Sequence, residues 1–69
     1  MVKLYTLPVC GICKVIKSKL VKKNIPFEEI QDLADFIEKY NIDHFPVLLL
    51  EDNTLLTSPK EINDWINIQ

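Results

Sequence analysis

Apolar residues in the first half of the chain form two short runs with a helical repeat between them. Residues 2–7 and 25–30 have the composition of strands, and Pro8 suits the end of the first because proline lacks an N–H donor. Between the two runs, apolar positions alternate with lysines at helical spacing, which predicts an amphipathic helix over residues 12–23 with an inner face of Ile12, Val15, Ile16, Leu20 and Val21. Asn24 suits the C-terminal cap of this helix.

The second half of the chain begins with another helical repeat, followed by two apolar runs. A helix is predicted over 32–41, with Asp32 as its N-cap and an apolar face of Leu33, Phe36, Ile37 and Tyr40. The uninterrupted apolar run 47–50 is typical of a central strand that is covered on both faces. Residues 51–54 read as a turn into a short strand at 55–56, so the two strands form a hairpin.

A capping box marks the start of the last helix. Ser58 is followed by Pro59 at the first helical position and by Glu61 three residues after the serine. The helix is therefore predicted over 59–68, with a buried face of Ile62, Trp65 and Ile66. The complete order of elements is βαβαββα.

This order predicts an α/β fold with a four-stranded mixed sheet and three helices on its two faces. The right-handed crossover rule makes the first two strands parallel neighbours, and the hairpin makes the last two antiparallel. The chain has 69 residues and a hydrophobic content of 48%, which is enough for one small folded domain over 1–69 and too short for a second.

Charge and hydropathy exclude several classes of partner. The chain carries a net charge of −2, its lysines gather before residue 25, all of its acids follow that point, and it has no arginine. A nucleic-acid-binding protein would present a basic surface without this acidic remainder. No apolar run approaches a membrane span, and the first residues lack the pattern of a signal peptide. We therefore expect a monomeric cytoplasmic protein that binds neither nucleic acid nor membrane.

Cys10 and Cys13 form a CxxC pair at the predicted start of the first helix. In a reducing cytosol, cysteines placed this close together are more often redox-active or metal-binding than structural. The free N–H groups and positive dipole end of a helix favour a thiolate on Cys10, which we expect to be the nucleophile, with Cys13 as the resolving thiol. A zinc site would need further soft ligands, and the chain offers one histidine and no third cysteine. Inert thiols are the remaining alternative.

Three segments, 3–14, 24–30 and 43–47, resemble the signature regions of glutaredoxins and related small redoxins of the thioredoxin fold. The resemblance implies a thioredoxin-like fold of the glutaredoxin type and thiol–disulfide oxidoreductase activity on protein or small-molecule disulfides. It also implies a cis Pro46 beside the cysteines, with Phe45 presenting its backbone to an incoming disulfide. No bound cofactor or metal is implied, and glutathione or a thioredoxin-reductase system would supply the electrons.

The chain departs from glutaredoxins where that family binds glutathione. Leu7 stands in place of a lysine, and side-chain-bearing residues stand in place of a Gly-Gly pair. The residues in place of the Gly-Gly pair are Thr57 and Ser58, and the other departures are at Gly11, Ile12, His44, Phe45 and Lys60. Because most charged contacts to the tripeptide are missing, we expect weak use of glutathione. Apolar contact with a protein segment is expected instead, at Leu7, Ile12 and Phe45.

Two other functions stay open at this stage. Gly11 occupies the position where glutaredoxins usually carry proline, and glutaredoxin-like sites without that proline tend to assemble clusters. A non-enzymatic carrier holding a [2Fe–2S] cluster through Cys10 of two subunits is therefore an alternative, as is a redox-inert interaction module. Minor candidates for a role near the thiols are His44, Tyr5, Lys14 and Lys17.

Overall fold

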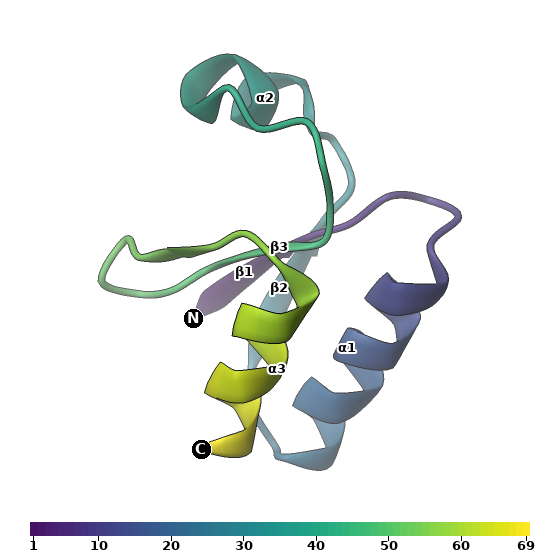
Figure 1. Ribbon diagram of the computed structural model, residues 1–69, viewed down its shortest axis with the longest axis vertical. Helices are drawn as coiled ribbons and strands as arrows, with labels where there is room; N and C mark the ends of the chain where they lie inside the picture. Colours follow the sequence, from purple (N-terminus) through teal and green to yellow (C-terminus); the bar gives the residue numbers. More distant parts are fainter.

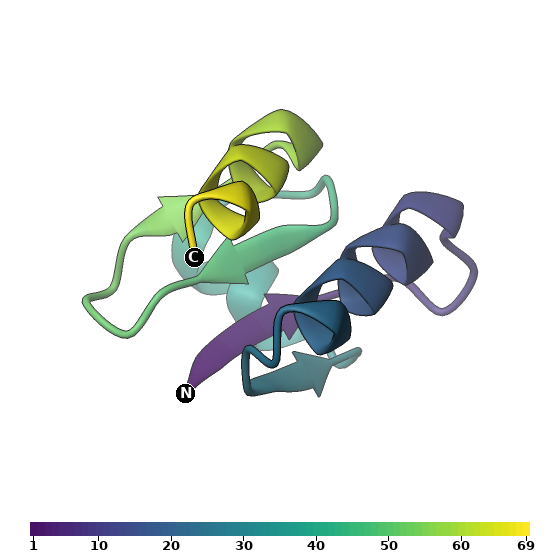
Figure 2. The same cartoon turned by 90° about the horizontal axis from the view of Figure 1, so that it is seen from below.

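The computed structural model describes residues 1–69, the whole chain, and contains the predicted seven elements in the predicted order. A four-stranded sheet carries two helices on one face and one on the other (Figures 1 and 2). The elements are β1 (Val2–Tyr5), α1 (Gly11–Lys22), β2 (Phe27–Ile30), α2 (Ala34–Tyr40), β3 (Val47–Leu49), β4 (Leu55–Leu56) and α3 (Pro59–Asn67). The longest helix, α1, has 12 residues, and no helix is long and apolar enough to cross a membrane.

The strands lie in the order β2-β1-β3-β4. β1 pairs in parallel with β2, while β3 pairs antiparallel with both β1 and β4. These pairings confirm the predicted crossover and hairpin. Tyr5, the last residue of β1, lies opposite Val47, the first residue of β3. The loops that follow Tyr5 and precede Val47 therefore leave from the same end of the sheet.

Side chains point alternately to the two faces of the central strands, which divides the core into two layers. Leu4 and Leu48 face α1 and α3, and pack with their inner residues, Ile16, Leu20, Ile62 and Ile66. Tyr5 and Val47 point to the opposite face, where they pack with Phe36 of α2. Successive residues of a strand point to opposite sides, so one apolar run supplies both layers. The prediction of a central strand covered on both faces is confirmed.

Several helix ends are closed as the sequence predicts. The Glu61 N–H donates to Ser58 Oγ at 3.2 Å, and Pro59 opens α3. Asn24 and Asn41 follow α1 and α2 with positive φ values of 56° each, a conformation that asparagine tolerates better than most residues. The prediction of Asp32 as the N-cap of α2 is wrong, because the helix begins two residues later without a side-chain cap.

Some residues predicted to be buried lie on the surface. Ile12, Val15 and Val21 are all more than half exposed, since the inner stripe of α1 consists of Cys13, Ile16 and Leu20 and the helical rotation turns the other three residues outward. Ile37 of α2 is also exposed. Trp65 is half-buried and packs against the edge of the core instead of anchoring its centre.

Candidate active site

Cys10 and Cys13 lie where the loop after β1 enters α1. Cys10 is the N-cap of this helix, with extended backbone angles of φ −153° and ψ 108°, and Cys13 lies in the first turn. The two residues form a disulfide, with their Cα atoms 5.3 Å apart. The predicted strand-to-helix placement of the CxxC pair is therefore confirmed. Cys10 and Cys13 are therefore close enough to form a disulfide within one chain.

The two sulfurs have different surroundings. Cys10 is half-buried, whereas Cys13 is only 2% exposed. The backbone N–H of Cys13 donates to Cys10 Sγ at 3.1 Å, and no acidic residue occupies the first turn of α1. A hydrogen-bond donor and a positive dipole end thus face the sulfur of Cys10, which favours negative charge there when the disulfide is reduced.

Phe45 and Pro46 lie at the same end of the sheet as the loop to the cysteines, because they directly precede β3. Their peptide bond is cis, as the resemblance implied. Pro46 is buried, and the half-buried ring of Phe45 packs against Phe36 at a centroid separation of 5.7 Å. The predicted substrate residues Phe45 and Pro46 are far from Cys10 in the sequence, but the fold places their segment at the same end of the sheet as the cysteine loop.

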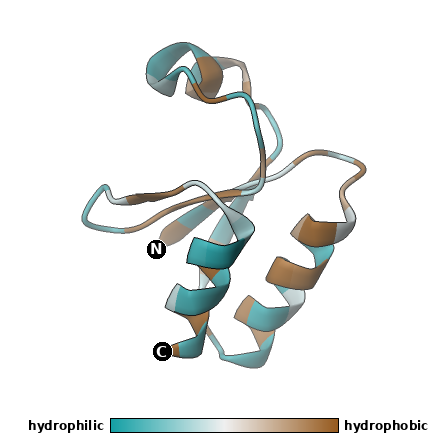
Figure 3. Cartoon of the chain, in the orientation of Figure 1, coloured by the Kyte–Doolittle hydropathy of each residue, from teal (hydrophilic) through white to brown (hydrophobic).

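Hydrophobic residues flank Cys10 in the loop between β1 and α1 and in the first turns of α1 (Figure 3), and several of them are exposed. The predicted substrate residues Leu7 and Ile12 are 42% and 53% exposed. Val9, which the sequence did not mark as a substrate contact, is 93% exposed. We call Leu7, Val9 and Ile12 the apolar rim. Its three residues are exposed within three positions of Cys10 on either side, so they are free to contact another molecule.

His44 precedes the cis bond and contacts the backbone of a distant loop. Its Nε2 lies 3.0 Å from the carbonyl oxygen of Thr57, so the ring N–H donates to that oxygen. This bond ties the loop before Pro46 to the segment that opens α3. The proposed influence of His44 on a thiolate has no hydrogen bond to a sulfur to support it, and its recorded contact is structural.

A polar network that the sequence did not reveal connects the start of the active-site loop to α1 and β2. The hydroxyl of fully buried Thr6 donates to Glu29 Oε2 at 2.8 Å, and Lys17 Nζ lies 3.0 Å from the same oxygen. The Lys17 ammonium and, next, the Thr6 hydroxyl hold the pKa of Glu29 below its ordinary value of 4.5. Lys17 is thus committed to an ion pair, while Lys14 is exposed on the same helix. No local pattern signals this network, because its members lie on three separate elements.

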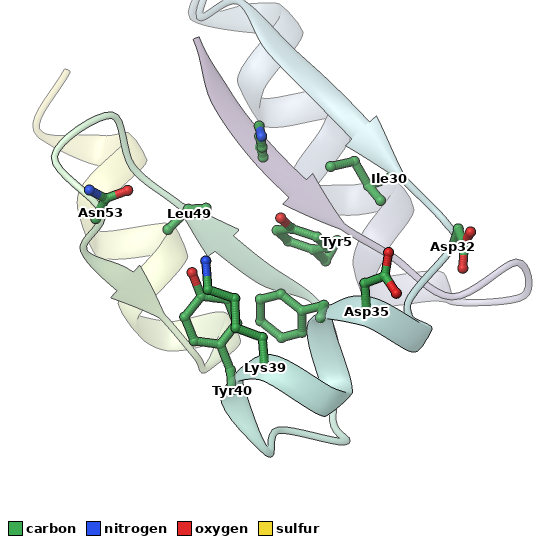
Figure 4. Close-up of a pocket in the computed structure, with 10 residues that line it drawn as sticks. Tyr5, Ile30, Asp32, Asp35, Lys39, Tyr40, Leu49 and Asn53 are labelled. Atoms are coloured by element: carbon green, nitrogen blue, oxygen red, sulfur yellow. The ribbon is translucent and has the colours of Figure 1, made fainter.

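A separate hollow of about 470 Å³ lies between α2 and the sheet, and neither cysteine lines it (Figure 4). We call it the α2 hollow. The ring of Tyr5 forms part of its wall and packs against Phe36 with centroids 4.2 Å apart. The sequence left open whether Tyr5 borders the redox site, and the structure places it instead in the core cluster under α2. No group of three or more His, Cys, Asp or Glu side chains is arranged to hold a metal ion.

Solved structures show what this architecture is similar to. A thioredoxin-like protein, solved as a variant, superposes with a TM-score of 0.74 at 18% identity, over 99% of this chain and 96% of that one. The chain has the thioredoxin fold. This finding confirms the predicted fold class.

Two glutathione transferases match the same fold over part of their length. A homologue from Sulfitobacter, solved with bound glutathione, has a TM-score of 0.82 at 22% identity over 99% of this chain. A glutathione transferase from Methylococcus capsulatus strain Bath has a TM-score of 0.83 at 25% identity, also over 99%. The present chain spans only 36% and 37% of these two proteins. No protein-family model and no curated protein matches the sequence.

Proposed function

We propose that this protein is a thiol–disulfide oxidoreductase in which Cys10 is the nucleophile and Cys13 the resolving thiol. The observation that supports this most strongly is the Cys10–Cys13 disulfide at the N-terminus of α1, with Cys10 as the capping residue. A cap position supplies N–H donors to a thiolate, and cysteines at such helix ends have pKa values of about 3.5 to 7.5 in other proteins. The thioredoxin fold of the chain agrees with this chemistry.

The reaction proceeds in two exchanges. The Cys10 thiolate attacks one sulfur of the substrate disulfide, which forms a mixed disulfide and releases the first substrate thiolate. The Cys13 thiolate then attacks Cys10 Sγ, which forms the Cys10–Cys13 disulfide and releases the second substrate thiolate. The substrate gains two electrons and the protein loses two. A thiol reductant, either glutathione or a thioredoxin-reductase system, returns the pair to the dithiol state.

Burial supports this division of roles. Cys13 is 2% exposed, so a substrate sulfur cannot approach it directly, whereas Cys10 is only half-buried. The lysines on α1 and the absence of acid in its first turn further favour a thiolate at Cys10. Cys13 has access to the mixed disulfide because it lies directly beside Cys10.

The substrate class follows from the surroundings of Cys10. The apolar rim and the half-buried Phe45 suit an extended protein segment with apolar side chains next to its disulfide. Glutathione is bound in one related structure. Of the charged side chains that glutaredoxins use for it, the lysine is replaced by Leu7 and one acid by Lys60, while Thr57 and Ser58 add side chains where that family has glycines. We therefore propose protein disulfides as the main substrates, with the protein acting as a monomer in the cytoplasm.

The test is a disulfide-reduction assay on insulin, run in parallel with glutathione and with a thioredoxin-reductase system. We expect turnover by the native protein with at least one reductant and none by Cys10→Ser. Cys13→Ser should accumulate a mixed disulfide through Cys10, which mass spectrometry detects. Turnover by Cys10→Ser would overturn the mechanism. A brown, cluster-bearing dimer after anaerobic purification, without reductase activity, would support the iron–sulfur carrier instead.

A further inference from the structure

The α2 hollow is a second concave feature, on the face of the sheet opposite α1 and α3. It exists because α2 has only seven residues and therefore spans about 10 Å, which leaves part of this face uncovered. Its volume of about 470 Å³ lies within the range of small-molecule sites in proteins. Neither the cysteines nor the apolar rim line it, so it is distinct from the proposed redox site.

Tyr5 directs a hydrogen-bonding group into this hollow. The residue is 8% exposed, and its hydroxyl makes no hydrogen bond within the protein. Since no fully buried side-chain polar atom lacks a partner, the hydroxyl must reach open space, and Figure 4 shows it directed into the hollow. Burial, followed by the neighbouring Tyr40, raises the pKa of Tyr5, so the group remains a donor at neutral pH. A buried ring with an unpartnered donor is suited to a ligand that carries an acceptor.

Charged groups of opposite sign occupy the two ends of the hollow. Figure 4 shows Asp32 and Asp35 at one end, and Lys39 with Tyr40 at the other. Lys3 of β1, which lies opposite Leu49 of β3, also lines the hollow and adds a second cation. None of these charged side chains takes part in the three ion pairs of the protein. Asp35 and Lys39 are four residues apart on α2, yet Lys39 Nζ lies 5.2 Å from the centre of the Tyr40 ring and makes no ion pair with Asp35. Both ends are therefore available to a ligand.

The floor between these ends is aromatic. The ring of Phe36 lies between Tyr5 and Tyr40, with centroid separations of 4.2 Å and 4.8 Å. Phe36 is 4% exposed and Tyr5 is 8% exposed, so a ligand that spans the hollow would contact the edges of these rings and half-buried Tyr40. Asp35 and Lys39 are offset by about 6 Å along the helix axis. The two ends of an extended dipeptide are separated by about 7 Å, whereas those of a single amino acid are closer together.

We propose that the α2 hollow binds a short apolar peptide with free ends, of dipeptide size. Its carboxylate lies toward Tyr5, Lys39 and Tyr40, and its ammonium lies toward Asp35 and Asp32. The aromatic floor holds the side chains. This site is independent of the disulfide chemistry, so it stands or falls separately from the proposed function.

The test is an amide NMR titration of the full chain with four matched probes. These are Ala-Phe with free ends, its N-acetyl form, its C-terminal amide and the doubly blocked form. We expect shifts at residues lining the hollow, with about fivefold weaker binding when either end is blocked, as for one exposed ion pair. Equal affinity for all four probes would overturn the proposal, and so would shifts confined to Cys10 and Phe45.

Variants assign each end of the ligand. Lys39→Gln should weaken only the probes with a free carboxylate, and Asp35→Asn only those with a free ammonium. Tyr5→Phe keeps the ring but removes the donor, and should weaken the carboxylate-bearing probes. The matched controls, Lys60→Gln and Asp64→Asn, change an exposed ion pair on α3 and should leave all affinities unchanged. Equal losses in the controls would show a general charge effect and overturn the assignment.

Discussion

The backbone N–H of Cys13 donates to the sulfur of Cys10 at 3.1 Å, so half-buried Cys10 caps the helix by accepting a bond from buried Cys13. The sulfur proposed as the nucleophile is therefore also the N-cap acceptor of α1. In the reduced protein the same donor faces the Cys10 thiolate, whereas the sulfur of Cys13 lies inside the core-facing stripe of α1. The two thiols should therefore differ in reactivity even though they are three residues apart.

Alkylation measures this difference directly. Iodoacetamide at pH 6 to 7 should modify Cys10 faster than Cys13 in the reduced native protein, because both thiolate stability and exposure favour Cys10. Peptide mapping by mass spectrometry gives the rate at each site. The unfolded protein in denaturant is the control, and there the two rates should converge. Equal rates in the native protein would contradict the proposed roles.

Glutathione should have no dedicated site near Cys10. In the Cys13→Ser variant, the mixed disulfide with glutathione should be no more than about tenfold more stable than that with 2-mercaptoethanol, a difference of about 1.4 kcal/mol. The reason is that Leu7 supplies no charge for a carboxylate of the tripeptide, and Thr57 and Ser58 carry side chains where glycines would let the backbone approach it. Thiol-exchange equilibria measured by mass spectrometry give the ratio. A larger preference would show that other residues form a glutathione site.

The Glu29 network should make stability depend on pH in the acid range. Because Lys17 and Thr6 lower its pKa in the folded state, the stabilisation is complete above the ordinary value of 4.5. It is lost as the pH falls from there through the lowered folded-state pKa, since protonated Glu29 no longer pairs with Lys17. Glu29→Gln should be less stable than the native protein at pH 7 and should lack this acid-dependent loss.

Urea unfolding at a series of pH values checks the network, with Glu38→Gln as the matched control. Glu38 is an exposed residue of α2 without a recorded ion pair, so its substitution should leave the pH profile close to native. Native-like acid sensitivity in Glu29→Gln would show that other carboxylates are responsible.

The capping box of α3 should contribute measurably to stability. Ser58→Ala removes the acceptor for the Glu61 N–H and should lower the free energy of unfolding by about 0.5 to 2 kcal/mol. Ser58→Asp should retain most of the stability that the cap contributes, because aspartate caps helices as well as serine does. Ser18→Ala, at an exposed position inside α1, is the control. A loss in the control as large as that in Ser58→Ala would indicate that the cap itself is unimportant.

The sequence by itself determined the order of the elements, the relative directions within the β1–β2 and β3–β4 pairs, and the position of the CxxC pair at a helix start. These depend on short-range signals. They are the two-residue and 3.6-residue repeats of apolar positions, the capping box at Ser58, and the ability of asparagine, as at Asn41, to adopt a positive φ. The crossover rule and the hairpin gave the two outer strand pairs, whereas the central β1–β3 pairing, which sets the order β2-β1-β3-β4, was not predicted.

Only the tertiary structure decided which surfaces meet. The rotation of α1 about its axis, set by packing against α3 and the sheet, turned Val15 outward and placed Lys17 against Glu29 of β2. The short α2 helix left the Tyr5 hydroxyl facing an open hollow, although the strand pattern offered Tyr5 only as a core residue or a neighbour of the thiols. Such contacts join residues far apart in the chain. They depend on the three-dimensional placement of whole elements, which local periodicity does not encode.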